Sequence, residues 1–123
     1  MLQNDFFTVI ASSGEGSSFL AKLALNARHR IFEGHFPGQP VVPGVCLMQM
    51  VQEVMELALG GGPLWLLRAD QMKFIMPIDP RKTGELEMKL DWGRKEEGTV
   101  QVTASVSDGG KLCFKFNGVF AHE

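Results

Sequence analysis

The carboxy-terminal half of the chain contains ELEMKLDW at residues 85–92, in which every even position is apolar and every odd position is charged. A period of two places the apolar side chains on one face of a β-strand and the charged ones on the other. Similar alternation returns in residues 99–107 and 111–116, after a polar loop at 93–98 and tight-turn residues at 107–110. Strands with a single apolar face are typical of antiparallel sheets, so we predict a three-stranded meander here.

Earlier parts of the chain carry less regular strand signals. Residues 6–10 and 18–26 favour two strands joined by a glycine-containing turn at 14–16. Residues 64–76 form a further extended candidate, which Pro77 ends.

One long helix is predicted over residues 45–59. A Gly-Gly-Gly-Pro stop at 60–63 marks its end. Apolar side chains cover most of its circumference and leave one narrow polar stripe. The stripe consists of Gln49, Gln52, Glu53 and Glu56. An antiparallel sheet curled around this helix would bury both elements, which predicts a single two-layer α+β domain over residues 1–123. Such a sheet has unpaired edges, so we also expect a homodimer that pairs them.

Composition excludes several classes of protein. The chain has 123 residues, of which 45% are hydrophobic and 21% charged, so intrinsic disorder is excluded. Its apolar runs are too short for a membrane span, its amino terminus is a poor secretory signal, and its net charge of −2 does not favour nucleic-acid binding. Two cysteines, Cys46 and Cys113, are too few for a disulfide framework or a zinc site. We therefore expect a cytoplasmic protein with reduced thiols and no bound metal.

The segment that carries chemistry is HFPGQPVVPGV at residues 35–45. Its prolines and glycines predict a rigid, shaped loop that leads into the start of the helix. Helix starts offer unpaired N–H groups that can hold a carbonyl oxygen as it gains negative charge. His35, ahead of the loop, is the residue type best suited to proton transfer near neutral pH. This order suggests enolate-type chemistry beside a carbonyl, although a proline-rich loop before a helix is also common in proteins without catalysis.

The same motif closely resembles the signature of the β-hydroxyacyl-acyl-carrier-protein dehydratases of fatty acid synthesis, which have the hot-dog fold. Gly34 before the motif and the later segment 72–80 (MKFIMPIDP) resemble the family as well. The resemblance implies a long central helix wrapped by a curved antiparallel sheet, working as a dimer. It implies that His35 removes the C2 proton of a 3-hydroxyacyl thioester, and that the backbone N–H of Gly44, with Val45 beside it at the substrate-binding helix start, holds the thioester carbonyl.

The acidic residue of the family falls on Gln49, and a neutral amide cannot deliver a proton. One turn later, where the family usually has glutamine, this chain has Glu53. Positions i and i+4 share a helix face, so our hypothesis is that Glu53 is the proton donor and that Gln49 orients the hydroxyl group. The alternative is that Glu53 belongs to a solvated polar stripe.

Arg81 and Lys82 have two interpretations. They are surface charges that keep the protein soluble, or they dock the acidic surface of an acyl carrier protein, as the resemblance implies.

The chain has no tyrosine, so Phe74 and Met76 are the candidates for lining an acyl channel.

Three other candidates have only weak support for a chemical role. Cys46 at the helix start is expected to be buried and inert rather than a nucleophile. His29 and His122 match no motif and are expected at the surface.

The resemblance thus implies a (3R)-hydroxyacyl-acyl-carrier-protein dehydratase-like lyase of lipid metabolism, which forms a trans-2-enoyl thioester and needs no cofactor. Two alternatives stay open. In a hot-dog thioesterase, Glu53 would activate water against the thioester. In a degenerate acyl-binding or partner subunit, Gln49 would mark the loss of the acid.

Overall fold

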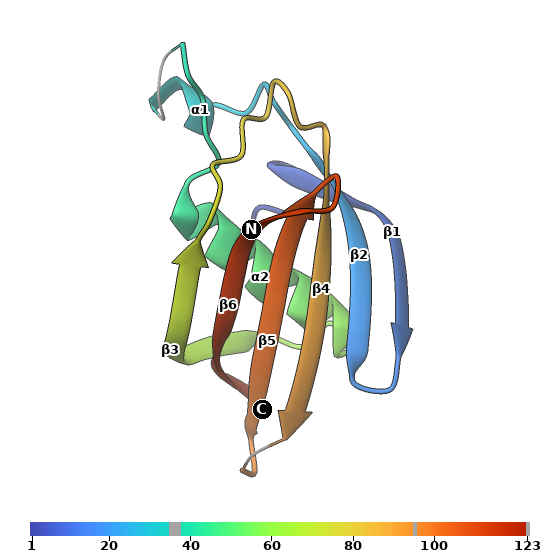
Figure 1. Ribbon diagram of the computed structural model, residues 1–123. Coiled ribbons are helices and arrows are strands. Elements are labelled where there is room, and N and C mark those ends of the chain that lie inside the picture. The colour runs from blue at the N-terminus through green and yellow to red at the C-terminus, as the bar shows by residue number, and fades with distance from the viewer. Residues whose placement is uncertain (35–37, 95, 123) are drawn as a thin grey trace.

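A curved antiparallel sheet forms the body of the computed structural model, which describes residues 1–34, 38–94 and 96–122. Its strands are β1 (Phe7–Glu15), β2 (Ser18–Leu25), β3 (Leu64–Phe74), β4 (Glu85–Arg94), β5 (Thr99–Asp108) and β6 (Lys111–His122). Their order is β1-β2-β4-β5-β6-β3, which leaves β1 and β3 at the edges (Figure 1). Strands β4, β5 and β6 are the predicted meander.

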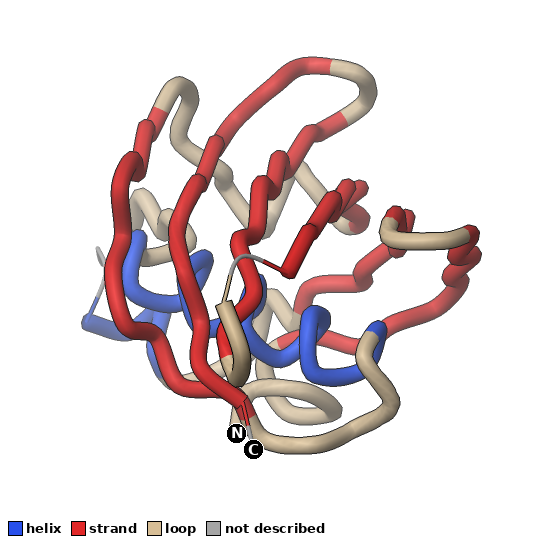
Figure 2. Tube along the Cα trace, turned by 90° about the horizontal axis from the view of Figure 1, so that it is seen from below, coloured by secondary structure: helices blue, strands red, loops and turns tan. Residues whose placement is uncertain are grey.

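Helix α2 (Gly44–Ala58) lies against the inner face of the sheet, which curves around it (Figure 2). The helix begins after Pro43, whose backbone is extended, and the chain leaves it through Gly60 and Gly61, whose φ angles are 101° and 100°. That left-handed region favours glycine, which is why the predicted stop is effective.

The alternating strands bury the side chains that their pattern predicted. Leu86, Met88 and Leu90 on β4 are 1% exposed or less. Met88 lies opposite Val106 and Leu90 opposite Ala104, so the apolar faces of β4 and β5 meet the same helix. Burial of such side chains is the main stabilising contribution to a two-layer domain.

The largest differences from the prediction are the ends of two strands and one additional helix. Strand β1 continues to Glu15 instead of ending at Ile10, because a register shift between Val9 and Ala11 interrupts the alternation. Strand β6 continues to His122 instead of ending at Phe116. A short helix, α1 (Ile31–Gly34), was not predicted, since four residues carry no usable periodicity.

Close packing of β3 on β6 depends on a glycine. A Cβ atom on Gly118 would lie 2.5 Å from the carbonyl oxygen of Arg68 and 2.5 Å from Cζ of Phe116. The register of β3 against β6 shifts on both sides of Arg68–Ala69, which marks two bulges in the edge strand.

Across the described residues, the longest helix is shorter than a membrane crossing requires, and none qualifies as a span.

Candidate active site

The start of helix α2 is built around a close contact with the end of β3. A Cβ atom on Gly44 would lie 2.7 Å from both Cε1 and Cζ of Phe74, so the ring packs where a larger residue would place its side chain. Among the described residues, no side chain caps this helix start. Val45, one position further, is 75% exposed. The first N–H groups of a helix lack intrahelical partners, which suits the start of α2 for binding a carbonyl oxygen.

An apolar pocket of about 250 Å³ adjoins this contact. It is lined by Val41, Val42, Leu47, Phe74, Ile75, Met76, Pro77 and Ile78. Both residues that the sequence suggested for an acyl channel, Phe74 and Met76, therefore lie in its wall. The pocket joins the Pro/Gly loop, the first turns of α2 and the segment after β3, and its lining suits a hydrocarbon chain.

Glu53 is the buried acidic residue of helix α2, with 1% of its surface exposed. Its Oε1 accepts a hydrogen bond from the backbone N–H of Gln3 at 2.7 Å, and its Oε2 accepts one from the N–H of Leu2 at 2.8 Å. The side-chain amide of Gln49 donates a third bond to Oε2 at 2.9 Å. The structure thus brings Gln49 and Glu53 together, as their spacing predicted, and shows that the alternative of a solvated Glu53 is wrong.

The other two residues of the polar stripe, Gln52 and Glu56, form hydrogen bonds with the backbone of Leu64. Gln52 donates from Nε2 to the carbonyl oxygen of Leu64 at 3.0 Å, and Glu56 accepts from the N–H of the same residue at 2.8 Å. Both side chains are partly buried. The stripe therefore holds the amino-terminal segment at one end and the first residue of β3 at the other. Sequence reasoning missed Leu2, Gln3 and Leu64 because they act through backbone groups, which no residue type reveals.

His35 lies outside the described residues, directly after the short helix α1 in the sequence. In α1, Phe32 is buried and packs on Phe6, with ring centroids 5.4 Å apart. His29 accepts a hydrogen bond on Nδ1 from the N–H of Ile31 at 3.1 Å, and its Nε2 lies 3.0 Å from Oδ2 of Asp5.

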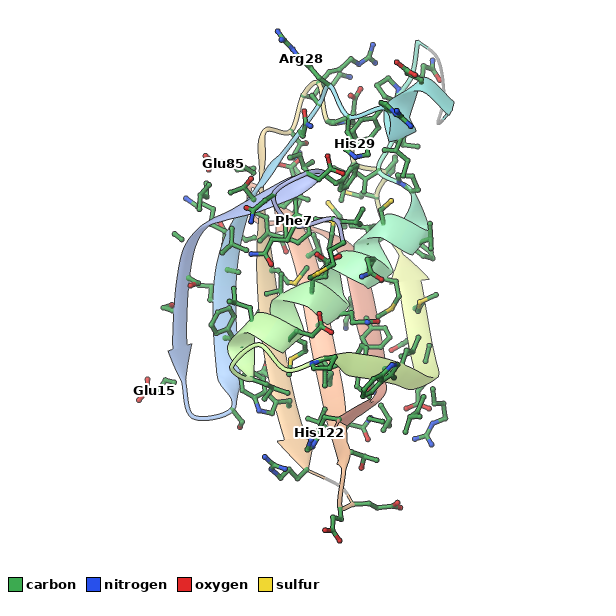
Figure 3. The ribbon with its side chains drawn as sticks, turned by 180° about the vertical axis from the view of Figure 1, so that it is seen from behind. Phe7, Glu15, Arg28, His29, Glu85 and His122 are labelled. Carbon is green, nitrogen blue, oxygen red and sulfur yellow. The ribbon has the colours of Figure 1, made fainter. Side chains whose placement is uncertain are left out.

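His29 is half-buried at the surface, since its side chain is 19% exposed and its Nδ1 accepts the first backbone N–H of α1. Figure 3 shows His29 at one end of the sheet and His122, which is partly buried, at the other.

Arg81 holds the loop that follows His35 in sequence. Its Nη1 donates to the carbonyl oxygen of Gly38 at 3.1 Å, and its Nη2 pairs with Oδ2 of Asp79 at 3.0 Å. Hydrogen bonds from the Arg81 side chain and from its backbone N–H lower the pKa of the Asp79 carboxyl. About half of the Arg81 side chain stays exposed, and Lys82 beside it is exposed as well.

Cys46 is buried near the helix start, and burial raises the pKa of its thiol. A thiol with a raised pKa holds little thiolate at neutral pH, which agrees with an inert role.

Comparison with known proteins identifies the family. A family model described as ApeI-like, ApeI dehydratase, matches residues 11–115. Curated relatives named 3-hydroxyacyl-[acyl-carrier-protein] dehydratase FabZ include those of Oenococcus oeni, 31% identical over 80% of this chain and 74% of its own, and Thermomicrobium roseum, 33% identical over 73% and 63%. For a third, from Herpetosiphon aurantiacus, the identity is 33% over 61% of this chain and 57% of its own.

Solved structures show the same fold. The dehydratase heterocomplex ApeI:P from Xenorhabdus doucetiae has a TM-score of 0.75 and 22% identity, and covers 92% of this chain and 96% of its own. A hypothetical thioesterase from Streptococcus pneumoniae, solved with coenzyme A, has a TM-score of 0.67 and 8% identity, covering 98% and 90%. The sheet wrapped around α2 is thus the hot-dog fold, and the chain belongs to the ApeI-like family of dehydratases, which are lyases.

Proposed function

We propose that this chain removes water from a (3R)-hydroxyacyl thioester carried by acyl carrier protein and releases a trans-2-enoyl thioester. The family assignment supports the reaction, and the names of the FabZ relatives support the substrate. His35 takes the C2 proton, in the role that the motif gives it. The C3–O bond then breaks as the hydroxyl group gains a proton and leaves as water, and the electron pair from C2 forms the double bond.

Glu53 is our candidate for the residue that protonates the departing hydroxyl. The observation that carries this assignment is the 2.9 Å hydrogen bond between Gln49 and Glu53 on one face of α2. Nε2 of Gln49 donates to Glu53, so the side-chain oxygen of Gln49 is the atom that accepts a hydrogen bond from the substrate hydroxyl and orients it. For this step Glu53 must be protonated, on Oε1, because Oε1 accepts a single N–H whereas Oε2 accepts two. That proton passes to the hydroxyl group directly or through one water molecule and leaves Glu53 as the carboxylate, which the proton taken up by His35 then replenishes through solvent.

Gly44 and the pocket place the rest of the substrate. The N–H of Gly44 holds the thioester carbonyl, with the exposed Val45 beside it. The acyl chain then lies along Phe74 and Met76 in the adjoining pocket.

Water loss from a 3-hydroxyacyl thioester, measured in single-residue variants, tests these roles. His35→Ala abolishes turnover. Glu53→Gln lowers kcat by about 10²–10⁴-fold, the usual contribution of a general acid. A Glu53→Gln variant that keeps full activity, beside an inactive His35→Ala, would show that Glu53 is not the acid. Release of free thiol in the same assay would instead mark hydrolysis by a thioesterase.

A second candidate function is that of a non-catalytic acyl-binding partner subunit. Glu53 already accepts three hydrogen bonds from Leu2, Gln3 and Gln49, and Gln49 stands where the resemblance implies an acid. The related Xenorhabdus dehydratase is described as a heterocomplex, so pairing with a different subunit has a parallel. Tight binding of an acyl carrier protein without turnover at any chain length supports this candidate and contradicts the first.

We also propose a homodimer that docks the carrier in the cytoplasm. The exposed apolar side chains of edge strand β3 support the dimer, and the free, buried cysteines suit a reducing compartment. Lys82→Glu tests docking cleanly, because Arg81 also holds Gly38 and its reversal would disturb the loop. Carrier binding that is unchanged in Lys82→Glu removes Lys82 from the docking surface.

A further inference from the structure

The turn between β3 and β4 is held together by the carboxyl group of Asp79. Its Oδ1 accepts hydrogen bonds from the backbone N–H of Arg81 at 2.9 Å and from Nε of Arg81 at 3.2 Å, and its Oδ2 accepts one from Nη2 at 3.0 Å. The backbone carbonyl oxygen of Asp79 accepts two more, from the N–H groups of Lys82 and Thr83. One aspartate thus shapes the turn and orients the guanidinium group of Arg81.

The same turn is fastened to the sheet through Thr83. This residue is 5% exposed, and its Oγ1 donates a hydrogen bond to Oδ2 of Asp108 at 2.6 Å. Asp108 is the last residue of β5, a strand that pairs with β4 on one side and with β6 on the other. The guanidinium group of Arg81 is therefore held in place relative to the sheet.

Two hydrogen bonds join this turn to the Pro/Gly loop ahead of α2, and Figure 1 shows both segments at the same end of the molecule. Nη1 of Arg81 donates to the carbonyl oxygen of Gly38 at 3.1 Å. The backbone N–H of Val42 donates to the carbonyl oxygen of Ile78 at 2.9 Å. Residues 38–42 are thus attached to the turn at both of their ends. Of the two attachments, the one from Arg81 is made by a side chain and can be removed by substitution.

The attached loop contributes directly to the candidate site. Val41 and Val42 line the apolar pocket, together with residues 75–78, which lead into the turn that Asp79 holds. Two residues after Val42 the chain reaches Gly44, the first residue of α2. A displacement of the loop would therefore change both the width of the pocket and the position of the helix start.

We propose that Arg81 is a positioning residue for the dehydration: its guanidinium group, oriented by Asp79, holds the loop at Gly38 and so fixes the pocket and the start of α2. The inference rests on the proposed function for its reaction. It assigns Arg81 a role that is independent of the acyl carrier protein, because the contacts that carry it all lie within this chain.

The geometry requires arginine rather than a positive charge alone. Three guanidinium nitrogens are used at once, Nε and Nη2 on the carboxyl group of Asp79 and Nη1 on the carbonyl oxygen of Gly38. The planar group holds these donors in a fixed arrangement, whereas the ammonium group of a lysine is a single nitrogen on a flexible stem. Lysine at this position could bind Asp79 or Gly38 but could not bridge them in the same way.

Turnover of a carrier-free substrate, a 3-hydroxyacyl thioester of pantetheine, separates positioning from carrier docking. We expect Arg81→Gln to lower kcat by about 10–100-fold, with KM changed by less than about threefold, because a displaced helix start costs the transition state more than the bound substrate. The same loss of kcat is expected when the substrate is carried by acyl carrier protein. A loss confined to the carrier-borne substrate would assign Arg81 to docking and overturn the proposal.

Arg28→Gln is the matched control for the loss of charge. Arg28 is an exposed arginine at the same end of the molecule (Figure 3), and within the described part of the chain its side chain forms no hydrogen bond or ion pair. We expect Arg28→Gln to keep kcat for the carrier-free substrate within about twofold of the original. An equal loss in Arg28→Gln and Arg81→Gln would show an effect of net charge and overturn the proposal.

Conservative variants test the geometry. Arg81→Lys keeps the charge, and we expect its kcat to lie within about threefold of that of Arg81→Gln. Asp79→Asn retains an oxygen for the N–H of Arg81 but removes the charge and the second acceptor, so it should also lower kcat. The double variant Asp79→Asn/Arg81→Gln should be no slower than Arg81→Gln, since both changes remove the same support. Full activity in Arg81→Lys, or losses that multiply in the double variant, would overturn the proposal.

Hydrogen–deuterium exchange tests the attachment of the loop without relying on turnover. We expect the amide of Val42 to exchange at least about tenfold faster in Arg81→Gln than in the original chain or in Arg28→Gln. If the original chain does not dehydrate the thioester, the proposed function fails, and the exchange rate still decides whether Arg81 holds the loop. An exchange rate at Val42 that is unchanged in Arg81→Gln overturns the proposal.

Discussion

Gln49 donates a 2.9 Å hydrogen bond to Oε2 of Glu53, one helical turn further along α2. The two residues share one face of the helix and one short contact, so exchanging the acid and the amide between their positions keeps the carboxyl at the same part of the helix. This contact gives a physical reason for a dehydratase to have glutamine where the resemblance implies the acid.

Restoring the order that the resemblance implies tests that reason. The double variant Gln49→Glu/Glu53→Gln keeps one carboxyl and one amide in contact, and we expect its kcat to stay within about tenfold of the original, whereas Glu53→Gln alone loses about 10²–10⁴-fold. Steady-state assays of enoyl thioester formation measure both. A double variant as inactive as Glu53→Gln would show that the two positions are not equivalent.

Gln49→Glu alone places two carboxyl groups in contact beside a buried site. We expect it to lower the free energy of unfolding by about 1–3 kcal/mol, because Oε2 of Glu53 loses a donor and gains a like charge. Urea unfolding measures the change. Gln49→Ala, which removes the donor without adding a charge, is the control and should cost less.

Removing a backbone donor tests how Glu53 anchors the amino terminus. Gln3→Pro deletes the N–H that bonds to Oε1 at 2.7 Å, and we expect a loss of about 1–3 kcal/mol for a buried acceptor left without its partner. Gln3→Ala keeps the N–H and should change the unfolding midpoint little. Equal midpoints for the two variants would contradict the anchor.

Adding one methyl group at the helix start tests the contact of Gly44 with Phe74. Gly44→Ala forces the Phe74 ring to move, since the new Cβ would lie 2.7 Å from it. We expect Gly44→Ala to lower the melting temperature of the original chain but not of Phe74→Ala, where the ring is absent. A double-mutant cycle gives the coupling, and additive effects would contradict the contact.

Gly118→Ala should be more harmful, because its Cβ would meet the backbone oxygen of Arg68 rather than a mobile ring. We expect a loss of about 1–3 kcal/mol or more from this overpacking, measured by urea unfolding. Gly93 on β4 has open space at its Cβ position, so Gly93→Ala is a matched control and should be nearly neutral.

Thiol labelling tests the buried cysteines. Burial raises the pKa of the Cys46 thiol. The pKa of Cys113 is raised mainly by burial and, to a smaller extent, by the negative charge of Asp108. Both thiols therefore hold little thiolate at pH 7.5. Alkylation of the native protein should be at least tenfold slower than alkylation in urea, where both react. Fast labelling of either cysteine without unfolding would contradict its burial.

The sequence by itself determined the elements and much of the architecture. Alternation in 85–92 predicted both β4 and its buried face, and the glycines after Leu59 predicted the end of α2. It failed where regularity breaks, at the bulge after Val9 and in the four residues of α1. Local periodicity reports which side of an element is apolar, and it is silent where a bulge shifts the phase or a helix is shorter than two turns.

The surroundings of the polar stripe were decided only by the tertiary structure. Spacing placed Gln49 and Glu53 on one face of α2, but not what that face meets. Glu53 meets backbone groups of Leu2 and Gln3, about 50 positions away in the sequence. A peptide N–H is the same in nearly every residue, so its use as a partner leaves no mark on the residue types and becomes visible only when the chain has folded.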